Sequence, residues 1–234
     1  MLSPRPTVVF IPGLLNDKKL WQHQTDALSQ YAEIIVADLS QDDNLPAMAA
    51  RILNQAPAKF ALVGLSMGGY VAFEVMRQAP ERVTKLALFD TSARPDSATS
   101  AKHRQATIHS LKVGRFMGVT NKLLPQIIHP SRVHEPFAEE IKAMAQRIGG
   151  IGFINQQTAI LARRDSRPLL ADIQVPTLIA VGENDLVTPV KLAQEMHEGI
   201  AHSQLHIFKQ CGHLPPMECP EETTQLLRDW LQQK

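Results

Sequence analysis

The chain has 234 residues, a formal net charge of +1, and 44% hydrophobic against 20% charged residues. This composition is typical of a globular protein, and the balanced charge and the 5% of aromatic residues argue against a nucleic-acid partner. The two cysteines, Cys211 and Cys219, cannot build a disulfide framework, and no apolar run approaches the ~20 residues of a membrane span. The sequence therefore predicts a cytoplasmic protein with no membrane or nucleic-acid partner.

Apolar runs of strand length recur along the chain and alternate with segments of helix length. The runs are continuously apolar, which is typical of strands buried on both faces of a parallel sheet. The predicted strands lie at 7–11, 33–37, 59–63, 85–89, 177–181 and 204–208, and the predicted helices at 21–30, 45–55, 67–78 and 189–198. This alternation predicts an α/β fold with a mostly parallel sheet and helices on both faces.

The alternation stops after the strand that ends near Phe89. Residues 94–167 show no strand pattern and contain helix-like pieces interrupted by Pro and Gly. We therefore predict a core formed by residues 1–93 and 168–234, with a helical lid inserted at 94–167. Between 94 and 134 the insertion carries seven Lys or Arg and one acidic residue. Such a charge attracts anionic substrates, although a solvated helix face gives the same pattern.

A serine at a strand-to-helix turn is the first candidate for chemistry. Gly64-Leu65-Ser66-Met67-Gly68 joins the third predicted strand to the third predicted helix, the setting in which a Gly-x-Ser-x-Gly turn lifts a nucleophile above a sheet. Ser66 then lies at a helix N-terminus, where the free N–H of Met67 can stabilise a developing anion. The alternative is an ordinary glycine-rich turn in which Ser66 caps the helix.

A serine nucleophile needs a base, and the base needs an acid that orients it. His213 follows the last predicted strand and is our candidate base. Asp185 lies in the loop after strand 177–181 and is our candidate acid, with Glu183 as a close alternative and Asp90 as a more distant one. A loop aspartate can equally serve as a turn or capping residue.

Acyl transfer also needs a second backbone N–H that points at the oxyanion. The loop at 12–16, after the first predicted strand, supplies it, with Leu14 as our candidate and Leu15 as the alternative. The two cysteines flank His213 in sequence but offer with it at most three ligands, and prolines stand between them. We therefore predict no metal site and no cofactor.

Together these motifs resemble the α/β-hydrolase superfamily, and within it the small lid-bearing serine hydrolases, which include carboxylesterases and a menaquinone-pathway lyase. The resemblance spans nearly the whole chain and rests on Pro12-Gly13, the Gly64–Gly68 turn, Gly182-x-x-Asp185 and Gly212-His213. It implies a catalytic triad, an oxyanion hole and hydrolysis of carboxylic esters of small substrates through an acyl-enzyme. The residues that would carry these roles are Ser66, Asp185 and His213 for the triad, and Leu14 and Met67 for the oxyanion hole.

Two features depart from that family pattern. Pro12 stands where many relatives have His, and only six residues precede the first predicted strand, which predicts a sheet of six strands rather than eight. The triad itself is compatible with more than one activity. A thioesterase or lyase that acts on an anionic or CoA-type substrate is one alternative, and a non-catalytic ligand receptor on the same fold is another.

Overall fold

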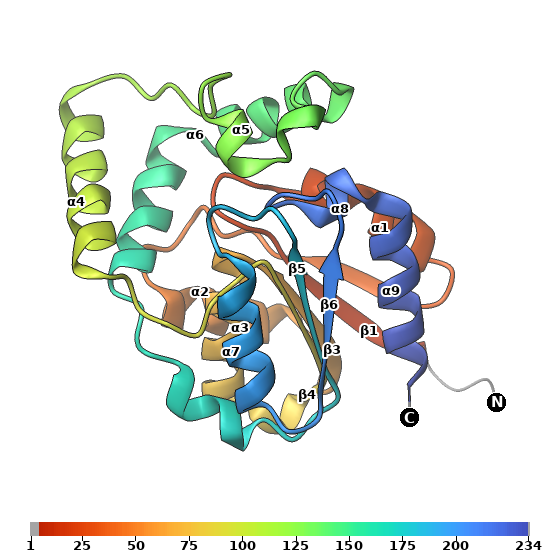
Figure 1. Cartoon of the computed structure of the whole chain (residues 1–234). Helices are drawn as coiled ribbons and strands as arrows, with labels where there is room; N and C mark the ends of the chain where they lie inside the picture. Colours follow the sequence, from red (N-terminus) through yellow and green to blue (C-terminus); the bar gives the residue numbers. More distant parts are fainter. Residues whose placement is uncertain (1–4, 234) are drawn as a thin grey trace.

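Six parallel strands form the centre of the computed structural model of the chain, which describes residues 5–233 (Figure 1). They are β1 (Thr7–Ile11), β2 (Glu33–Val36), β3 (Phe60–Leu65), β4 (Val83–Phe89), β5 (Thr177–Gly182) and β6 (Ser203–Phe208). Their order in the sheet is β2-β1-β3-β4-β5-β6, and each neighbouring pair is parallel. Each predicted apolar run coincides with one of these strands. The predicted fold class is therefore confirmed.

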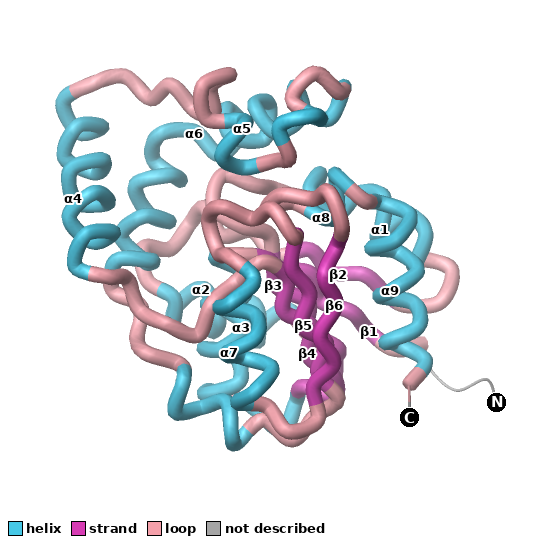
Figure 2. Tube along the Cα trace, in the orientation of Figure 1, coloured by secondary structure: helices cyan, strands magenta, loops and turns pink. Residues whose placement is uncertain are grey.

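Helices cover both faces of this sheet (Figure 2). Those of the core are α1 (Gln22–Leu28), α2 (Leu45–Gln55), α3 (Met67–Gln78), α7 (Val190–Gly199), α8 (Pro215–Glu218) and α9 (Pro220–Gln232), with 3-10 turns η1 (Lys18–Trp21) and η2 (Pro80–Arg82). The first predicted helix begins as the η1 turn. Helices α8 and α9 were not among the helices predicted from the sequence. None of the helices described in 5–233 is long and apolar enough to cross a membrane.

Alternate residues along each strand pack into two separate apolar layers, as strand geometry requires. On β1, Val9 and Ile11 pack with α2, α3 and α7. Val8 and Phe10 pack on the opposite face with α1 and α9. The inner strands β1, β3 and β5 are buried at every position, which explains why the sequence shows continuous rather than alternating apolar runs there.

The chain leaves the sheet between β4 and β5 and forms a helical segment. It contains α4 (Ala98–Val113), α5 (Leu124–Ile127), η3 (Pro130–Arg132) and α6 (Pro136–Leu161), and η4 (Arg167–Asp172) leads back to the sheet. Helix α6 is kinked at Gly149, where φ is 69°. Figure 1 shows α5 and part of α6 above the carboxyl ends of β5 and β6. Residues 1–4 and 234, which the sequence analysis assigned to the core, lie outside the described residues.

Candidate active site

Ser66 occupies the turn between β3 and α3 in a backbone conformation that side chains rarely adopt. Its φ of 54° and ψ of −115° place a non-glycine residue in a strained part of the φ/ψ map. Two contacts hold it there. The Ser66 N–H donates to the Phe89 carbonyl (2.9 Å), and the Thr91 hydroxyl donates to the Ser66 carbonyl (2.7 Å). The strained turn is therefore fixed by the residues at the end of β4.

The glycines on either side of Ser66 are required by close approach of the backbone. A Cβ on Gly64 would lie 2.5 Å from the Gly68 carbonyl oxygen. A Cβ on Gly68 would overlap the carbonyl oxygen of Ile11, the last residue of β1. The junction of β1, β3 and α3 can pack this closely only because these two positions have no side chain.

The side chains of Ser66, His213 and Asp185 meet at the carboxyl edge of the sheet. His213 Nε2 lies 2.9 Å from Ser66 Oγ, and His213 Nδ1 lies 2.8 Å from Asp185 Oδ2. All three residues are buried, although Ser66 and His213 are 147 residues apart in the chain. The structure thus brings together the predicted nucleophile, base and acid, in an arrangement where an acid orients a base that reaches a hydroxyl.

The Asp185 carboxylate is surrounded by hydrogen-bond donors. Oδ1 accepts from the N–H groups of Val187 (2.8 Å) and Thr188 (3.0 Å), and Oδ2 accepts from the Thr188 hydroxyl (2.6 Å) as well as from His213. Burial alone would raise the pKa of Asp185. The charge of His213 and the hydrogen bonds from His213 and Thr188 outweigh burial and lower that pKa below its ordinary value of 3.8. Asp185 is therefore ionised at neutral pH.

The two alternative acids occupy other positions. Glu183 is exposed and forms an ion pair with Lys209 (2.6 Å). Asp90 is buried beside Asp185 and His213, and one ligand atom from each of these three residues lies within 4.8 Å of the other two. Across residues 5–233 this is the one group of three or more His, Cys, Asp or Glu side chains close enough to hold a metal ion, and it contains neither cysteine.

Two backbone N–H groups beside Ser66 have no hydrogen-bond partner among the described residues. They belong to Leu14, in the loop after β1, and to Met67, the first residue of α3. The N–H of Leu15 instead donates to Gln156 Oε1 on α6 (3.0 Å). The two predicted oxyanion donors, Leu14 and Met67, are therefore free to bind a ligand. The N–H of Leu15, the alternative donor, is already hydrogen-bonded to Gln156.

Glu218 organises the loop that carries His213, a role that the sequence analysis missed. Its carboxylate accepts hydrogen bonds from the N–H groups of Gly212 (2.9 Å), Leu214 (3.0 Å) and His129 (2.7 Å). Gly212 and Leu214 flank His213 directly, so a single buried side chain fixes the backbone on both sides of the imidazole. The only signal in the sequence is an acidic residue in the turn just after the histidine.

A cavity of about 240 Å³ opens at Ser66 and His213. Its remaining walls are mainly apolar and come from the loop after β1, from the helical segment, and from the loops that carry Asp185 and His213. They are formed by Leu14, Leu15, Asn16, Val119, Leu123, Ile127, Ile141, Phe153, Gln157, Val187 and Leu214. An apolar lining with few polar groups is typical of a small-molecule site.

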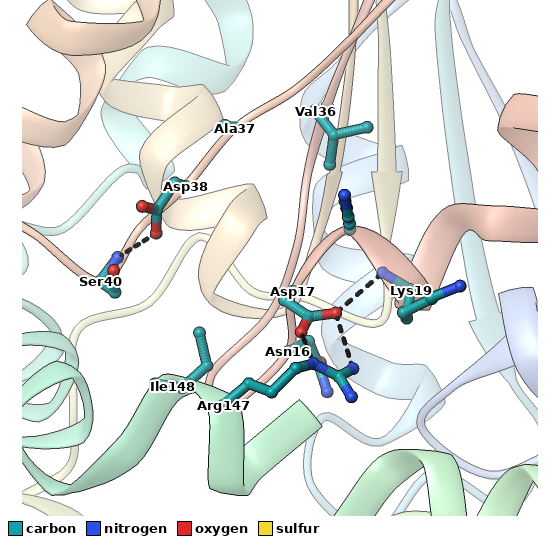
Figure 3. Close-up of a pocket in the computed structure, with 10 residues that line it drawn as sticks. Asn16, Asp17, Lys19, Val36, Ala37, Asp38, Ser40, Arg147 and Ile148 are labelled. Atoms are coloured by element: carbon teal, nitrogen blue, oxygen red, sulfur yellow. Dashed lines mark hydrogen bonds and ion pairs between the residues drawn. The ribbon is translucent and has the colours of Figure 1, made fainter. Parts of the chain in front are cut away.

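A second and larger cavity, of about 450 Å³, lies next to the first, and Asn16 lines both. Figure 3 shows that its wall is charged, with Asp17 bonded to Arg147 of α6 (2.5 Å) and to the N–H of Lys19 (2.9 Å). Ser66 and His213 line the smaller cavity and not this one. We therefore assign the chemistry to the smaller cavity despite its size.

Comparison with known proteins identifies the family. A sequence profile of the alpha/beta hydrolase fold matches residues 6–220. The chain belongs to the alpha/beta hydrolase family. The pimeloyl-[acyl-carrier protein] methyl ester esterase of Vibrio parahaemolyticus is 25% identical over 241 residues, which cover 97% of this chain and 94% of that protein.

Solved structures agree with this assignment. A thermophilic esterase from Thermogutta terrifontis superposes with a TM-score of 0.87 at 29% identity, covering 98% of this chain and 90% of that one. The enol-lactonase from Burkholderia xenovorans shares the fold, with a TM-score of 0.86 at 22% identity over 99% of this chain and 93% of that one. The comparisons confirm the predicted activity class of this alpha/beta hydrolase, which is the hydrolysis of esters by a serine hydrolase.

The basic run at 94–134 is partly neutralised in the folded hydrolase. Arg94 pairs with Glu195 (2.8 Å), and Arg104 pairs with Asp96 (2.8 Å). Arg132 lies 3.8 Å from the carboxylate of Glu135. Lys102, Arg115 and Lys122 are exposed and have no ion-pair partner among the described residues. None of these basic side chains lines the cavity at Ser66, so their charge acts outside it.

Proposed function

We propose that Ser66, His213 and Asp185 are the catalytic triad of an esterase that works through an acyl-enzyme. The distance of 2.9 Å between His213 Nε2 and Ser66 Oγ carries this proposal, because a base at that distance takes the hydroxyl proton as Oγ attacks the ester carbonyl. Asp185 orients the His213 ring and stabilises its positive charge. His213 then donates the proton to the leaving alcohol, and a water molecule, deprotonated by His213, hydrolyses the acyl-enzyme.

Each tetrahedral intermediate carries a negative charge on the former carbonyl oxygen. We assign the N–H groups of Leu14 and Met67 to that oxyanion, because both lack a protein partner within residues 5–233 and both lie beside Ser66. The positive end of the α3 dipole adds to the stabilisation at Met67. Donors fixed by the fold need no reorganisation when the charge forms, which is the source of their catalytic effect.

The substrate that this site fits best is a methyl or other small alkyl ester of an acyl chain. The relative in Vibrio parahaemolyticus is named for the methyl ester of a pimeloyl group on acyl-carrier protein. A mainly apolar cavity of about 240 Å³ suits such a chain better than a bulky ligand, since sites for drug-sized ligands hold about 300–1,000 Å³. A cytoplasmic location, which the two free cysteines support, belongs to the same proposal.

We assign residues 94–167 to a lid over this cavity. The support is that Val119, Leu123, Ile141 and Phe153 of this segment form part of its lining. The exposed charges of Lys102, Arg115 and Lys122 favour an acyl chain attached to an anionic group. On this basis kcat/KM for an anionic ester should fall as salt rises, while kcat/KM for a matched neutral ester stays constant. An equal response of both esters would remove the anionic preference from the proposal.

The triad is tested by Ser66→Ala on a panel of methyl esters of increasing acyl length. The variant should lose activity by about 10⁴-fold or more and keep its melting temperature. A fluorophosphonate probe should label the wild type and not the variant, because only an activated serine reacts quickly. CoA thioesters of the same acyl chains test the thioesterase alternative. Undiminished ester hydrolysis by Ser66→Ala would refute the assignment.

A further inference from the structure

Asp90 is a buried carboxyl group at the active site for which the mechanism above has no use. It follows β4 directly, is 1% exposed and has a positive φ of 42°. Its N–H donates to the Ala180 carbonyl (2.8 Å), and its Oδ1 accepts the N–H of Gly182 (2.8 Å). Both partners lie on β5, the strand that leads into the loop of Asp185. Asp90 therefore ties the end of β4 to the strand that leads into the loop of the acid.

The second oxygen of Asp90 has no partner. Oδ2 is buried and makes no hydrogen bond with any described residue. Asp90 belongs to the cluster in which one ligand atom from each of Asp90, Asp185 and His213 lies within 4.8 Å of the other two. A buried carboxylate oxygen without a donor, next to a second carboxylate, is a costly arrangement if both groups are ionised.

The distribution of donors decides which carboxyl group carries the charge. Asp185 receives four hydrogen bonds and the charge of His213, whereas Asp90 receives one hydrogen bond. When two carboxyl groups share a buried site, the one with fewer donors keeps the proton. We propose that Asp90 is a positioning residue of the hydrolase, a neutral acid that donates from Oδ2 to the Asp185 carboxylate and anchors the acid loop through Gly182.

The charges around Asp90 agree with this assignment. Burial and the neighbouring charge of Asp185 raise the pKa of Asp90 well above its ordinary value of 3.8, and Glu218 adds to the effect. The other titratable groups beside it are His213 and Cys211. The proposal rests on the triad roles of Asp185 and His213, since a donor to Asp185 matters for catalysis only if Asp185 orients the base.

Two variants of nearly equal shape test the proposal by kinetics. Asp90→Asn keeps the acceptor for Gly182 and replaces the O–H donor by an N–H donor, so it should retain most of the wild-type kcat. Asp90→Leu removes both groups and should lower kcat roughly 10–100-fold with little change in KM, as loss of a supporting contact does. If Asp90 were instead an ionised acid that orients the imidazole, Asp90→Asn would lower kcat by as much as about 10⁴-fold. Equal loss in both variants, or loss in neither, would overturn the proposal.

Infrared spectroscopy gives a readout that does not depend on turnover or on the stability of Asp90→Leu. At neutral pH the wild type should show the carbonyl band of a protonated, buried carboxylic acid, shifted in D₂O and absent from Asp90→Asn. The same band should persist in Ser66→Ala, so a failure of the proposed triad and a failure of the Asp90 proposal give different results. A spectrum in which Asp90→Asn and the wild type share every carboxylic acid band would refute the assignment.

Discussion

Replacement of Gln156 by Leu tests whether the helical segment holds the oxyanion loop in place. Gln156 is fully buried on α6, and its Oε1 accepts the N–H of Leu15 at 3.0 Å. This bond anchors the loop to α6 at Leu15. We expect the anchor to hold the neighbouring N–H of Leu14 beside Ser66, where it can bind the oxyanion. Leu has nearly the volume of Gln but no acceptor, so Gln156→Leu removes the anchor without opening a large cavity.

The contacts of Gln156 set the size of the expected effects. A buried N–H left unpaired costs about 1–3 kcal/mol. Gln156 Nε2 is itself buried without a partner, so the Leu variant also removes an unsatisfied amide, and the net change in unfolding free energy should stay below about 2 kcal/mol. Complete loss of one oxyanion donor lowers kcat about 10²–10³-fold. If the loop is displaced and the N–H of Leu14 still reaches the oxyanion, kcat should fall by about 10–100-fold.

The assay is kcat and KM on a methyl ester, measured beside thermal unfolding. Gln146→Leu is the matched control, because Gln146 lies on the same helix with an exposed amide that donates only a long contact of 3.4 Å to the Met117 carbonyl. We expect kcat of Gln156→Leu to fall while that of Gln146→Leu stays at the wild-type level. Equal kcat in the two variants would refute the reasoning that α6 positions Leu14.

Three other substitutions probe the supports of the site. Glu218→Gln should lower the free energy of unfolding by about 1–3 kcal/mol in a denaturant titration, since an amide has one acceptor oxygen for three N–H donors; an unchanged midpoint would contradict this. Asp185 has a lowered pKa in the fold, so its contribution to stability is present above its ordinary pKa of 3.8 and is lost as pH falls through the folded-state value; Asp185→Asn should lack this acid-dependent loss in urea unfolding. Gly64→Ala places a Cβ 2.5 Å from the Gly68 carbonyl oxygen. The variant should lower the free energy of unfolding by about 3 kcal/mol, which thermal unfolding detects as a lower melting temperature. A wild-type melting curve would show that the junction can relax.

The sequence predicts those parts of the site that are encoded by contiguous patterns. The proposed nucleophile is predictable because a buried strand, a pair of spaced glycines and a helix follow one another around Ser66. The positions of Asp185 and His213 are predictable once the strands before them are recognised, because parallel strands end at the same edge of the sheet. The helix α2 (Leu45–Gln55) shows the same principle, since the apolar spacing from Leu45 to Leu53 predicts a helix there and the structure has the predicted bounds.

The supporting residues cannot be predicted in this way, because their partners are distant in sequence. Gln156 lies 141 residues from Leu15, and Glu218 lies 89 residues from His129. Neither residue differs locally from a glutamine or glutamate on any helix. The closing helix α9 is a different case, because Thr223, Leu227 and Trp230 form a buried face at helical spacing that could have been predicted from the sequence.

Backbone strain in the described residues is concentrated where strands end at the site. The non-glycine residues with positive φ are Leu15, Ser66, Asp90 and Gln210, which follow β1, β3, β4 and β6. Such conformations cost of order 1–3 kcal/mol each and persist only when other contacts hold them.

Three of the four have identified contacts that hold them. The N–H of Ser66 is bonded to β4, that of Asp90 to β5, and that of Leu15 to α6. In the first two cases the holding contact comes from the neighbouring strand, so the spacing of nucleophile and acid is fixed by the register of the sheet. The helical segment supports two parts of the site, since α6 holds Leu15 and the carbonyl of Ile127 in α5 accepts the N–H of His213 (2.7 Å). Changes in that segment should therefore alter both the oxyanion loop and the loop that carries His213.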